Sequence, residues 1–527
     1  MLKKYQEFIP KSFLLLKRYS WELFRKDLLA GLTVGIVTIP LAMAFAMGAG
    51  VAPERGLYTA IVAGFIISLL GGSRVQIGGP TGAFVVVIYA VVQKYGYDGL
   101  ALATLMAAVI LIAMGILRLG SLIKYIPHPV ITGIITGIAV TLFSSQIKDF
   151  FGLKIEHLPP TFFGKWQAYF HAFPTINMTA TLTSLGSLGC IIFVRQKLPA
   201  VPWGIISIFL ATVICSVFNI PVETIISRFG EMPRMLPSPS LQHIDLSRIA
   251  EVFPAALTIA ILAAIESLLS AVISDKMIGG RHKPNCELIA QGLANIGSII
   301  FGGIPATAAI ARTATNVKTG GRTPLAGMFH AVVVVLVMFL LAPMVGLIPL
   351  CSLAALLVMV AWNMSELSHF IQIFKAPRSD ILILLVSFGL TVFIDITVAL
   401  EVGMVLAAFL FMKRMIDSKQ VIMPTSPTKL HSERGIESYD MFGPFFFGVA
   451  HHLKDVYYQR DKLPKMFILR MSQVPSLDAT GMNALHEFHT WCEKEKVALV
   501  LAHVKEDQIL TLKNFGLGHL IGEEPNV

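Results

Sequence analysis

The sequence predicts an all-α polytopic membrane domain of about fourteen segments, followed by a small α/β domain. Hydrophobic residues make up 55% of the 527-residue chain and charged residues only 14%, and the mean hydropathy is +0.72. Soluble proteins carry about 25% charged residues. Apolar runs recur from Leu28 to Met412, and hydrophobicity falls after Arg414. The membrane domain is therefore expected before Arg414 and the second domain after it.

The predicted membrane segments follow one another with short polar breaks. In order, they lie at 28–49, 56–71, 80–94, 99–117, 129–146, 178–194, 203–219, 254–274, 286–301, 306–316, 324–342, 350–362, 380–394 and 397–412. Because a spanning helix needs about 20 apolar residues, two of these segments are too short to cross alone. The first apolar run is long enough to span, so we expect no cleaved signal peptide.

The distribution of charge predicts the orientation in the membrane. The N-terminal segment 1–26 is basic, and the positive-inside rule makes it cytoplasmic. Counting alternately from there, each inside loop is basic, and these loops carry Arg74; Arg118 and Lys124; Arg195 and Lys197; Lys276, Arg281 and Lys283; Lys318 and Arg322; Lys375 and Arg378; Lys413 and Arg414. We expect a plasma (inner) membrane protein with both termini cytoplasmic. The net charge of +10 reflects these loops, not nucleic-acid binding.

A single carboxylate interrupts the apolar segment Phe253–Ser274, whose only charged residue is Glu266. An ionisable group near the middle of a spanning helix costs roughly 2.5–3.5 kcal/mol, and such groups usually face a cavity and serve ion or proton movement. We therefore interpret Glu266 as a group that couples transport to protons or cations. The alternative is a carboxyl group that only makes a structural hydrogen bond between helices.

Two short segments share a signature of two glycines, a proline and small residues. They read IGGPTGAFVVV over Ile77–Val87 and FGGIPATAAIA over Phe301–Ala311. Proline suits the first turn of a helix, and glycines let the backbone approach a ligand closely. The pattern predicts two half-helices that begin in mid-membrane and present their N-termini to an anion at a repeat interface. The alternative is a pair of ordinary proline-kinked helices.

Nothing in the sequence indicates an enzyme, a metal site or a cofactor. There is no nucleotide-binding P-loop, no set of paired metal ligands and no nucleophile elbow. His451 and His452 are adjacent, while His486 and His489 are helix-spaced without partner cysteines. The five cysteines have no spacing typical of a metal site or a disulfide framework, and they are Cys190, Cys215, Cys286, Cys351 and Cys492.

The tail has the pattern of a separate domain. After a linker at 415–438, strands are predicted at 441–450, 465–471 and 497–503, and a helix at 478–494 with an apolar stripe of i, i+3/i+4 spacing. Alternating strands and helices indicate a small α/β layer domain. The predicted organisation is a cytoplasmic segment at 1–26, a membrane domain at 27–414, the linker at 415–438 and the α/β domain at 439–527.

Three long stretches resemble the SulP, or sulfate-permease, family of anion transporters: Ile39–Phe84, Tyr125–Leu153 and Gly302–Gly327. The resemblance implies a seven-plus-seven inverted repeat, as in uracil-permease-like folds, with a core domain that holds the anion and a gate domain against which it moves. VPSLDATGMNAL, at Val474–Leu485, resembles the STAS domain that ends SulP proteins. Thr480 matches the hydroxyl residue phosphorylated in the similar anti-sigma-factor antagonists, although it is also suited to cap a helix.

The resemblance implies an anion site between the starts of the third and tenth helices and one face of the first. The matching residues here are Thr38, Leu41, Phe45, Pro80, Thr81, Gly82, Ala83, Ala308, Ala309, Ile310 and Ala311. Arg312 matches a family arginine near this site, with cytoplasmic snorkelling as its alternative role. Glu266 and Ser270, one turn apart, match the coupling position of the eighth helix. Thr38 and Leu41 replace glutamines of other members, and Ala311 replaces a serine, so we expect a less polar pocket.

The sequence thus favours a secondary active anion transporter, with proton-coupled uptake of sulfate or a related small anion by alternating access. Sodium- or proton-coupled transport of bicarbonate or a C4-dicarboxylate is an alternative. A passive anion channel is an alternative of another class, which Glu266 disfavours because its charge opposes anions. The only cofactor expected is the coupling ion, H⁺ or Na⁺. The expected partners are the lipid bilayer, a second copy in a homodimer and a cytosolic regulator at the STAS domain.

Overall fold

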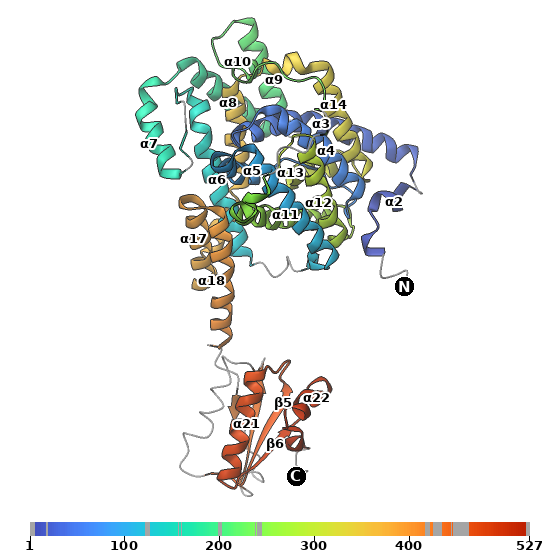
Figure 1. The fold of residues 1–527 in the computed structure, drawn as a ribbon, viewed down its shortest axis with the longest axis vertical. Helices are drawn as coiled ribbons and strands as arrows, with labels where there is room; N and C mark the ends of the chain where they lie inside the picture. The colour runs from blue at the N-terminus through green and yellow to red at the C-terminus, as the bar shows by residue number, and fades with distance from the viewer. Residues whose placement is uncertain are drawn as a thin grey trace. The chain divides into compact units, whose positions relative to one another are not determined.

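The computed structural model describes residues 6–16, 19–121, 127–155, 158–159, 161–198, 203–237, 239, 245–416, 422–424, 435–443, 445 and 463–522. The chain divides into two compact units, Met1–Val405 and Leu406–Val527. Helices make up the first unit, and the second contains a sheet with parallel strands (Figure 1). This arrangement confirms the predicted fold class.

Each predicted membrane segment lies on a helix, with ends that differ from the prediction by up to seven residues. The first half of the first unit contains α3 (Trp21–Gly48), α4 (Pro53–Leu70), β1 (Gly78–Gly79), α5 (Gly82–Ile116), α6 (His128–Phe151), α8 (Met178–Lys197) and α9 (Trp203–Val217). The second half contains α11 (Ile249–Ile278), α12 (Pro284–Ile300), β2 (Thr307–Ala308), α13 (Ile310–Lys318), α14 (Leu325–Gly346), α15 (Leu350–Met364), α17 (Arg378–Phe393) and the start of α18 (Ile396–Ile416), which continues into the second unit. Both halves begin with two helices, a two-residue strand and another helix.

The helices differ in length, because one helix joins two predicted segments and another is only about half as long as a membrane span. Nine of the described helices are long and apolar enough to span a membrane alone. α5 joins two predicted segments, at 80–94 and 99–117, and it is kinked at Gly96, where φ is 71°. α13 has only nine residues. It is a half-length helix, as its proline- and glycine-rich start predicts.

Short elements connect these helices. They are η1 (Gln6–Phe8), α2 (Lys11–Leu16), α7 (Phe162–Ala172), η3 (Phe173–Thr175), α10 (Ile225–Phe229), η4 (Leu246–Arg248) and α16 (Leu367–Ile373). The described part of the N-terminal segment is attached to the ends of α4 and α12. The amide of Lys11 donates to Gly71 O at 3.1 Å, and Lys283 Nζ donates to Ile9 O at 2.9 Å.

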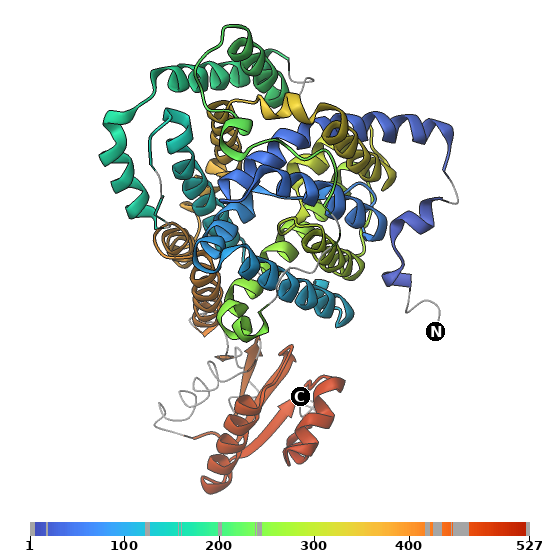
Figure 2. The ribbon, with the colours of Figure 1, turned by 45° about the horizontal axis from the view of Figure 1, so that its top comes forward.

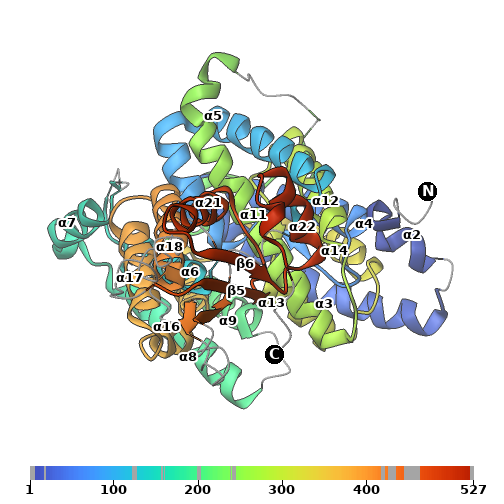
Figure 3. The same ribbon diagram turned by 90° about the horizontal axis from the view of Figure 1, so that it is seen from below.

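The membrane helices form two bundles. In the first bundle, α3, α4, α5 and α11–α14 pack on one another, and α14 runs along α3 (Figure 2). In the second bundle, α6 packs against α8, α15 and α17 (Figure 3). Glycines permit the closest contacts within each bundle. A Cβ on Gly31 would come within 2.6 Å of Ala326 O in the first bundle, and one on Gly137 within 2.6 Å of Thr391 Cβ in the second.

The second unit contains a four-stranded sheet in the order β3 (Ile422–Pro424), β4 (Ile436–Phe442), β5 (Met466–Gln473) and β6 (Ala498–Ala502). β4 and β6 both pair with β5 in parallel, and β3 pairs with β4 antiparallel. α21 (Ala479–Lys494), α22 (Glu506–Asn514) and η5 (Gly518–Leu520) complete it. Phe467, Leu485 and Phe488 are fully buried in its core.

The sequence predicted both ends of β5, β6 and α21 to within two residues. The first strand of the tail differs. β4 begins at Ile436, before the predicted strand at 441–450 and inside the predicted linker. Positions 444 and 446–450 of that predicted strand, and much of the linker, lie outside the described residues.

Candidate anion-binding and coupling site

A two-stranded ribbon joins the two motifs that share the glycine-proline signature. β1 pairs antiparallel with β2, with Gly78 opposite Ala308 and Gly79 opposite Thr307. α5 begins three residues after β1, and α13 begins two residues after β2. Segments more than 200 residues apart in the sequence therefore place two helix N-termini beside one ribbon. Each N-terminus carries unpaired N–H groups and a partial positive charge, which attract an anion.

Two buried donors at this ribbon have no hydrogen-bond partner in the described structure: Thr81 Oγ1 and Arg312 Nη1. The other terminal nitrogen of Arg312, Nη2, donates to Pro80 O at 2.8 Å. The Arg312 side chain is only 4% exposed, so it does not snorkel to the aqueous face. Buried polar groups in proteins are nearly always paired, so these two donors call for an explanation, and a bound anion would supply their acceptors.

Gly79 makes room for this arginine. A Cβ at position 79 would lie 2.5 Å from Arg312 Nη1, and the backbone φ of Gly79 is 141°. Both facts require glycine, because an L-residue rarely adopts this φ and any side chain would collide with the guanidinium group. Gly79, in the first motif, therefore leaves the space that the guanidinium group of Arg312, just after the second motif, occupies.

The walls of the site come from both bundles. A Cβ built on Gly82, the first residue of α5, would lie 2.8 Å from Met364 Sδ, 3.3 Å from Phe45 Cε1 and 3.7 Å from Leu142 Cδ2. Phe45 belongs to α3 in the first bundle, whereas Leu142 and Met364 belong to α6 and α15 in the second. The sequence predicted Phe45. It did not indicate Leu142 or Met364, which are apolar residues in apolar helices.

The remaining predicted anion-site residues differ in accessibility. Pro80, Gly82, Ala83 and Ala308 are buried, Ala309 and Ile310 are partly exposed, and Ala311 is exposed. The N–H of Ala309 already donates to Ile77 O at 3.2 Å, so it is not free for an anion. On α3, Leu41 is partly exposed, and Thr38 is buried with its hydroxyl 3.0 Å from His330 Nε2. The sequence did not single out His330.

Glu266 lies on α11 in a narrow apolar cleft. Val130, Ile134 and Ile135 of α6 and Leu400 of α18 line this cleft with it. Among the described residues, Glu266 makes no hydrogen bond and no ion pair. Its helix, α11, packs against α13, which carries Arg312. The structure therefore does not show the structural hydrogen bond that was the alternative role for this carboxylate.

A second carboxylate in the membrane domain has the opposite character. Glu287 on α12 is 0% exposed and accepts four hydrogen bonds, from Gly72 N at 2.8 Å, Ser73 N at 3.2 Å, Ser267 Oγ at 3.2 Å and Gln291 Nε2 at 3.0 Å. These bonds fix the turn after α4 to α11 and α12. The hydrogen bonds of Glu287 give it a structural role, whereas Glu266, on the neighbouring helix α11, has no such partner among the described residues.

Ser270, the second predicted coupling residue, is buried against α13. Its hydroxyl is 3.3 Å from Thr313 Oγ1, and Thr313 Oγ1 accepts a hydrogen bond from Ile77 N at 3.2 Å. Ser270 therefore links α11 to the half-helix α13 and, through Thr313, to the segment that leads into β1. The sequence did not indicate Thr313.

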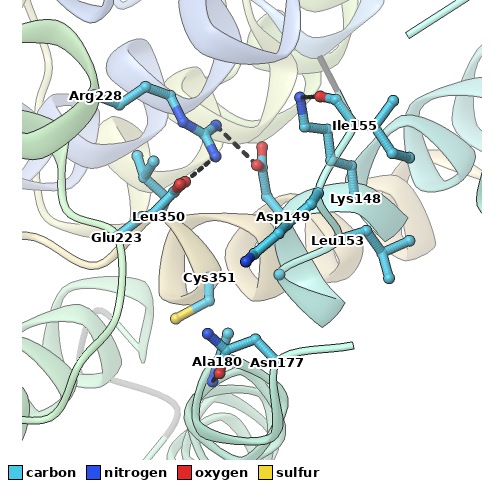
Figure 4. Close-up of a pocket in the computed structure, with 12 residues that line it drawn as sticks. Lys148, Asp149, Leu153, Ile155, Asn177, Ala180, Glu223, Arg228, Leu350 and Cys351 are labelled. Atoms are coloured by element: carbon cyan, nitrogen blue, oxygen red, sulfur yellow. Dashed lines mark hydrogen bonds and ion pairs between the residues drawn. The ribbon is translucent and has the colours of Figure 1, made fainter. Parts of the chain in front are cut away.

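A cavity of about 510 Å³ lies elsewhere in the first unit, and none of the predicted site residues lines it. Figure 4 shows Arg228 directed at Asp149, at 2.8 Å, and at Glu223, with Lys148 Nζ donating to Ile155 O. The positive charge of Arg228 is thus balanced by two carboxylates. By its size alone this cavity would be a candidate anion site. However, Arg228 is already paired with two carboxylates, whereas Arg312 Nη1 has no partner among the described residues.

The predicted residues of the tail lie on α21. Asp478 caps this helix, because its Oδ1 accepts from Gly481 N at 2.7 Å, so capping by Thr480 was wrong. Thr480 is exposed in the first turn. His489 Nε2 lies 3.0 Å from His519 Nε2, and partial burial lowers the pKa of His489 against the opposing effect of Glu493. No group of three metal-ligating side chains occurs among the described residues, and His451 and His452 lie outside them.

Comparison with known proteins gives matches along most of the chain. The sulfate permease family matches residues 24–387, and the STAS domain matches residues 430–527. YvdB of Bacillus subtilis (strain 168), named as a candidate sulfate transporter, is 39% identical over 512 residues, which are 96% of this chain and 97% of YvdB. The bicarbonate transporter BicA of Picosynechococcus sp. is 31% identical over 453 residues, 81% of this chain and 79% of BicA.

Two solved structures share the fold. Murine Slc26a9, an anion transporter in the inward-facing state, aligns with a TM-score of 0.89 at 19% identity, over 100% of this chain and 94% of that chain. The transmembrane domain of a cyanobacterial BicA aligns with a TM-score of 0.65 at 28% identity, over 74% of this chain and 98% of that chain. The chain is thus a multi-pass membrane transporter rather than an enzyme, and it belongs to the sulfate permease (SulP) family of anion transporters with a C-terminal STAS domain.

Proposed function

We propose that this protein takes up sulfate together with protons by alternating access. The observation that carries the proposal is the pair of unpartnered donors, Thr81 Oγ1 and Arg312 Nη1, beside two facing half-helix starts. Glu266 makes no hydrogen bond among the described residues, and its helix, α11, packs against α13, which carries Arg312. Sulfate offers the acceptor oxygens and the negative charge that these donors lack.

Coupling follows from the position of Glu266. A carboxylate in low dielectric favours its neutral form, and an arriving anion favours that form further. Two unit charges about 10 Å apart interact by roughly 1.7 kcal/mol at an effective dielectric of about 20, which is more than tenfold in affinity. For a divalent anion such as sulfate, the interaction energy with one unit charge is twice as large. Proton and anion binding therefore promote each other, because a coupling free energy acts equally on both ligands.

The geometry also supports the movement that alternating access requires. Phe45 and Gly82 of the first bundle meet Leu142 and Met364 of the second at the α5 start. The anion donors and Glu266 all belong to the first bundle. We infer that the first bundle is the core that carries the anion and that the second is the gate.

Bicarbonate is the second candidate substrate, because the chain is 31% identical to a bicarbonate transporter over most of its length. A C4-dicarboxylate and sodium coupling remain alternatives from the family resemblance. A sodium site would require the oxygens of Glu266 and Ser270 together. The Ser270 hydroxyl is bonded to Thr313, which favours protons over sodium. A passive channel would not need Glu266.

The experiment is uptake into proteoliposomes with labelled sulfate, bicarbonate and succinate, with pH and sodium gradients imposed separately. We expect sulfate uptake to rise as external pH falls and to ignore sodium. Glu266→Gln should lose this pH response or concentrative uptake while still exchanging sulfate for sulfate. Glu251→Gln, in the exposed first turn of the same helix, is the control. Uptake driven by sodium at fixed pH and abolished by Glu266→Gln would instead establish a cation site.

We also propose a membrane location, an oligomeric state and a mode of regulation for the protein. The basic loops support a plasma (inner) membrane location with both termini cytoplasmic. A homodimer and a cytosolic regulator at the STAS domain are proposed from the family resemblance, and the exposed Thr480 is a suitable site for phosphorylation. Crosslinking in native membranes tests the dimer, and mass spectrometry of the purified protein tests the modification.

A further inference from the structure

The ribbon that joins the two anion-site motifs is too short to hold its own position. β1 and β2 have two residues each, and they pair through Gly78 with Ala308 and through Gly79 with Thr307. Even a full-length two-stranded hairpin is marginally stable by itself, and glycine adds backbone freedom. The position of this ribbon must therefore come from side chains on the elements around it.

Asn295 of α12 binds the backbone of Ala306, the residue that directly precedes β2. Its Nδ2 donates to Ala306 O at 2.9 Å, and its Oδ1 accepts from Ala306 N at 2.8 Å. Nδ2 also donates to Gln291 O, one turn earlier in α12, at 2.8 Å. This third bond orients the amide, because a flipped group would set its oxygen against two carbonyl oxygens. The side chain is 0% exposed, and it pairs with Ala306 through one donor and one acceptor, as a neighbouring strand would.

Side chains of α13 hold the other strand of the ribbon. Asn316 Nδ2 donates to Val75 O at 2.7 Å, and Ile77 N donates to Thr313 Oγ1 at 3.2 Å. Asn316 and Thr313 are both buried. Their bonds fix the short segment that leads into Gly78, the first residue of β1.

Both donors of the proposed anion site lie close in sequence to these bonds. Thr81 follows β1 by two residues, and Arg312 follows β2 by four. Arg312 Nη2 is also bonded across the motifs, to Pro80 O at 2.8 Å. A ligand binds more weakly when its donors must first be ordered, so a ribbon that is already fixed favours anion binding.

We propose that Asn295 is a positioning residue for anion binding, which fixes β2 and thereby the placement of Arg312 relative to Thr81. Asn316 has the same role at β1. This inference rests on the proposed anion site at the ribbon. The sequence did not indicate Asn295, because an amide inside the predicted segment 286–301 has no local sign of its partner.

The test separates affinity from turnover during sulfate uptake by the full-length protein in proteoliposomes. Asn295→Leu keeps a branched side chain and removes both bonds to Ala306. We expect KM for sulfate to rise about tenfold, since two hydrogen bonds contribute roughly this factor. The kcat of the folded transporter should fall less than twofold, because a saturating anion still gathers the donors. Equilibrium binding of radiolabelled sulfate to monodisperse protein should weaken by the same factor as KM.

Asn285→Leu is the matched control. Asn285 lies in the first turn of the same helix and is buried, and its Oδ1 accepts from Gly120 N at 3.0 Å. This variant also loses a buried bond from an asparagine to the backbone, so its melting temperature should fall. Its KM and its affinity for sulfate should stay within about twofold of the wild-type values.

Asn316→Leu tests the β1 side independently, and it provides the test if Asn295→Leu does not fold. It removes one bond to the ribbon, so KM should rise about three- to fivefold with kcat largely retained. If either variant folds and binds sulfate as tightly as the wild type, its positioning role is overturned. An equal loss of affinity in Asn285→Leu would also overturn the inference, because the effect would then be general destabilisation.

The outcomes separate this inference from the proposed function. If Arg312→Ala leaves affinity unchanged, the proposed anion site itself fails. If Arg312→Ala weakens binding but Asn295→Leu and Asn316→Leu do not, only the positioning role is overturned. If the wild-type protein binds no sulfate, the proposed substrate fails, and the same variants are compared with labelled bicarbonate.

Discussion

Arg312 shows how one side chain decides between two roles that sequence alone leaves open. A basic residue after a short apolar segment is suited either to snorkel or to hold an anion. Its burial, the bond to Pro80 O and the unpaired Nη1 favour the anion role. Gly79 is its counterpart, since any side chain there would displace the guanidinium group. Thr81 supplies the second unpaired donor on the opposite motif.

Arg312→Ala should weaken sulfate binding by roughly 10- to 100-fold, since hydrogen bonds to charged groups contribute about 1.5–3 kcal/mol. Arg312→Lys should retain part of the affinity, because it keeps the charge but loses the planar donor geometry. Equilibrium binding of labelled sulfate in detergent provides the measurement. Arg281→Ala removes an exposed positive charge and is the control. Unchanged affinity in Arg312→Ala would return this residue to a structural role.

At the scale of helices, the second bundle depends on close contact between α6 and α17. Gly133 and Gly137 are one turn apart, and a Cβ on either would fall within 2.7 Å of α17 atoms. Without a strong hydrophobic force between helices in lipid, such small residues allow the backbone contact that holds them together. The spacing is visible in the sequence, but the partner helix is not, because the helices are more than 200 residues apart.

Gly137→Ala should destabilise the protein by about 1–3 kcal/mol, because overpacking forces the helices apart. Gly389→Ala is the matched control on α17, since no atom lies within 4 Å of the added methyl group. Alanine is a better helix former than glycine, so this control should be neutral or slightly stabilising. Thermal unfolding in detergent measures both. Equal melting temperatures for the two variants would show that the α6–α17 contact does not limit stability.

α7, a helix that the sequence did not predict, places a buried lysine against α5. Lys165 is 3% exposed, and its Nζ lies 4.8 Å from the centre of the Tyr89 ring. Burial lowers the pKa of Lys165 from 10.5 to about 8. Between these values the unfolded chain binds more protons than the folded chain, so stability rises with pH across this window. The contact joins an element beside the second bundle to a helix of the first.

The stability of the wild type relative to Lys165→Met should therefore increase between pH 8 and pH 10.5 by on the order of 3 kcal/mol at most. Melting temperatures of both proteins across pH 7–11 provide the measurement. Lys154→Met, at an exposed position in the same region, should show no such trend relative to the wild type. A constant difference between wild type and Lys165→Met at every pH would contradict the low pKa.

At the scale of the whole molecule, the chain separates into a helical unit that contains every candidate anion-binding and coupling residue and a second unit with its own core. Tyr439, Phe467, Leu485, Phe488 and Leu512 are buried within the second unit. The donors at β1 and β2 lie entirely in the first unit. The STAS domain is therefore expected to regulate or assemble the transporter and not to form the site.

A chain that ends at Asp417 should still bind sulfate with an affinity within about threefold of the full-length protein, since no site contact is removed. Binding of labelled sulfate to the purified, monodisperse truncated protein is the measurement. Full-length protein with Thr480→Ala is the control for a modification effect. Normal folding with complete loss of binding would show that the tail helps to build the site.

The sequence by itself determined the helical class, the approximate position of each membrane segment, the two half-helix starts and the unusual carboxylate Glu266. These features are local, because each can be recognised from neighbouring residues. They are the length of an apolar run, a glycine or proline at a helix start, and a charge inside an apolar run. Most of α21, β5 and β6 was predictable for the same reason. α7 and α16 were not, because they are short and carry no span-length apolar run.

Only the tertiary structure decided which partners these features have. It joined β1 to β2, turned Arg312 inward and committed Ser270 and Glu287 to hydrogen bonds, whereas Glu266 makes none among the described residues. It also placed Met364 beside Gly82 at the anion site. Such contacts join residues far apart in the chain, and the free energy of a buried polar group depends on whether its partner is present. Local pattern carries no information about that partner.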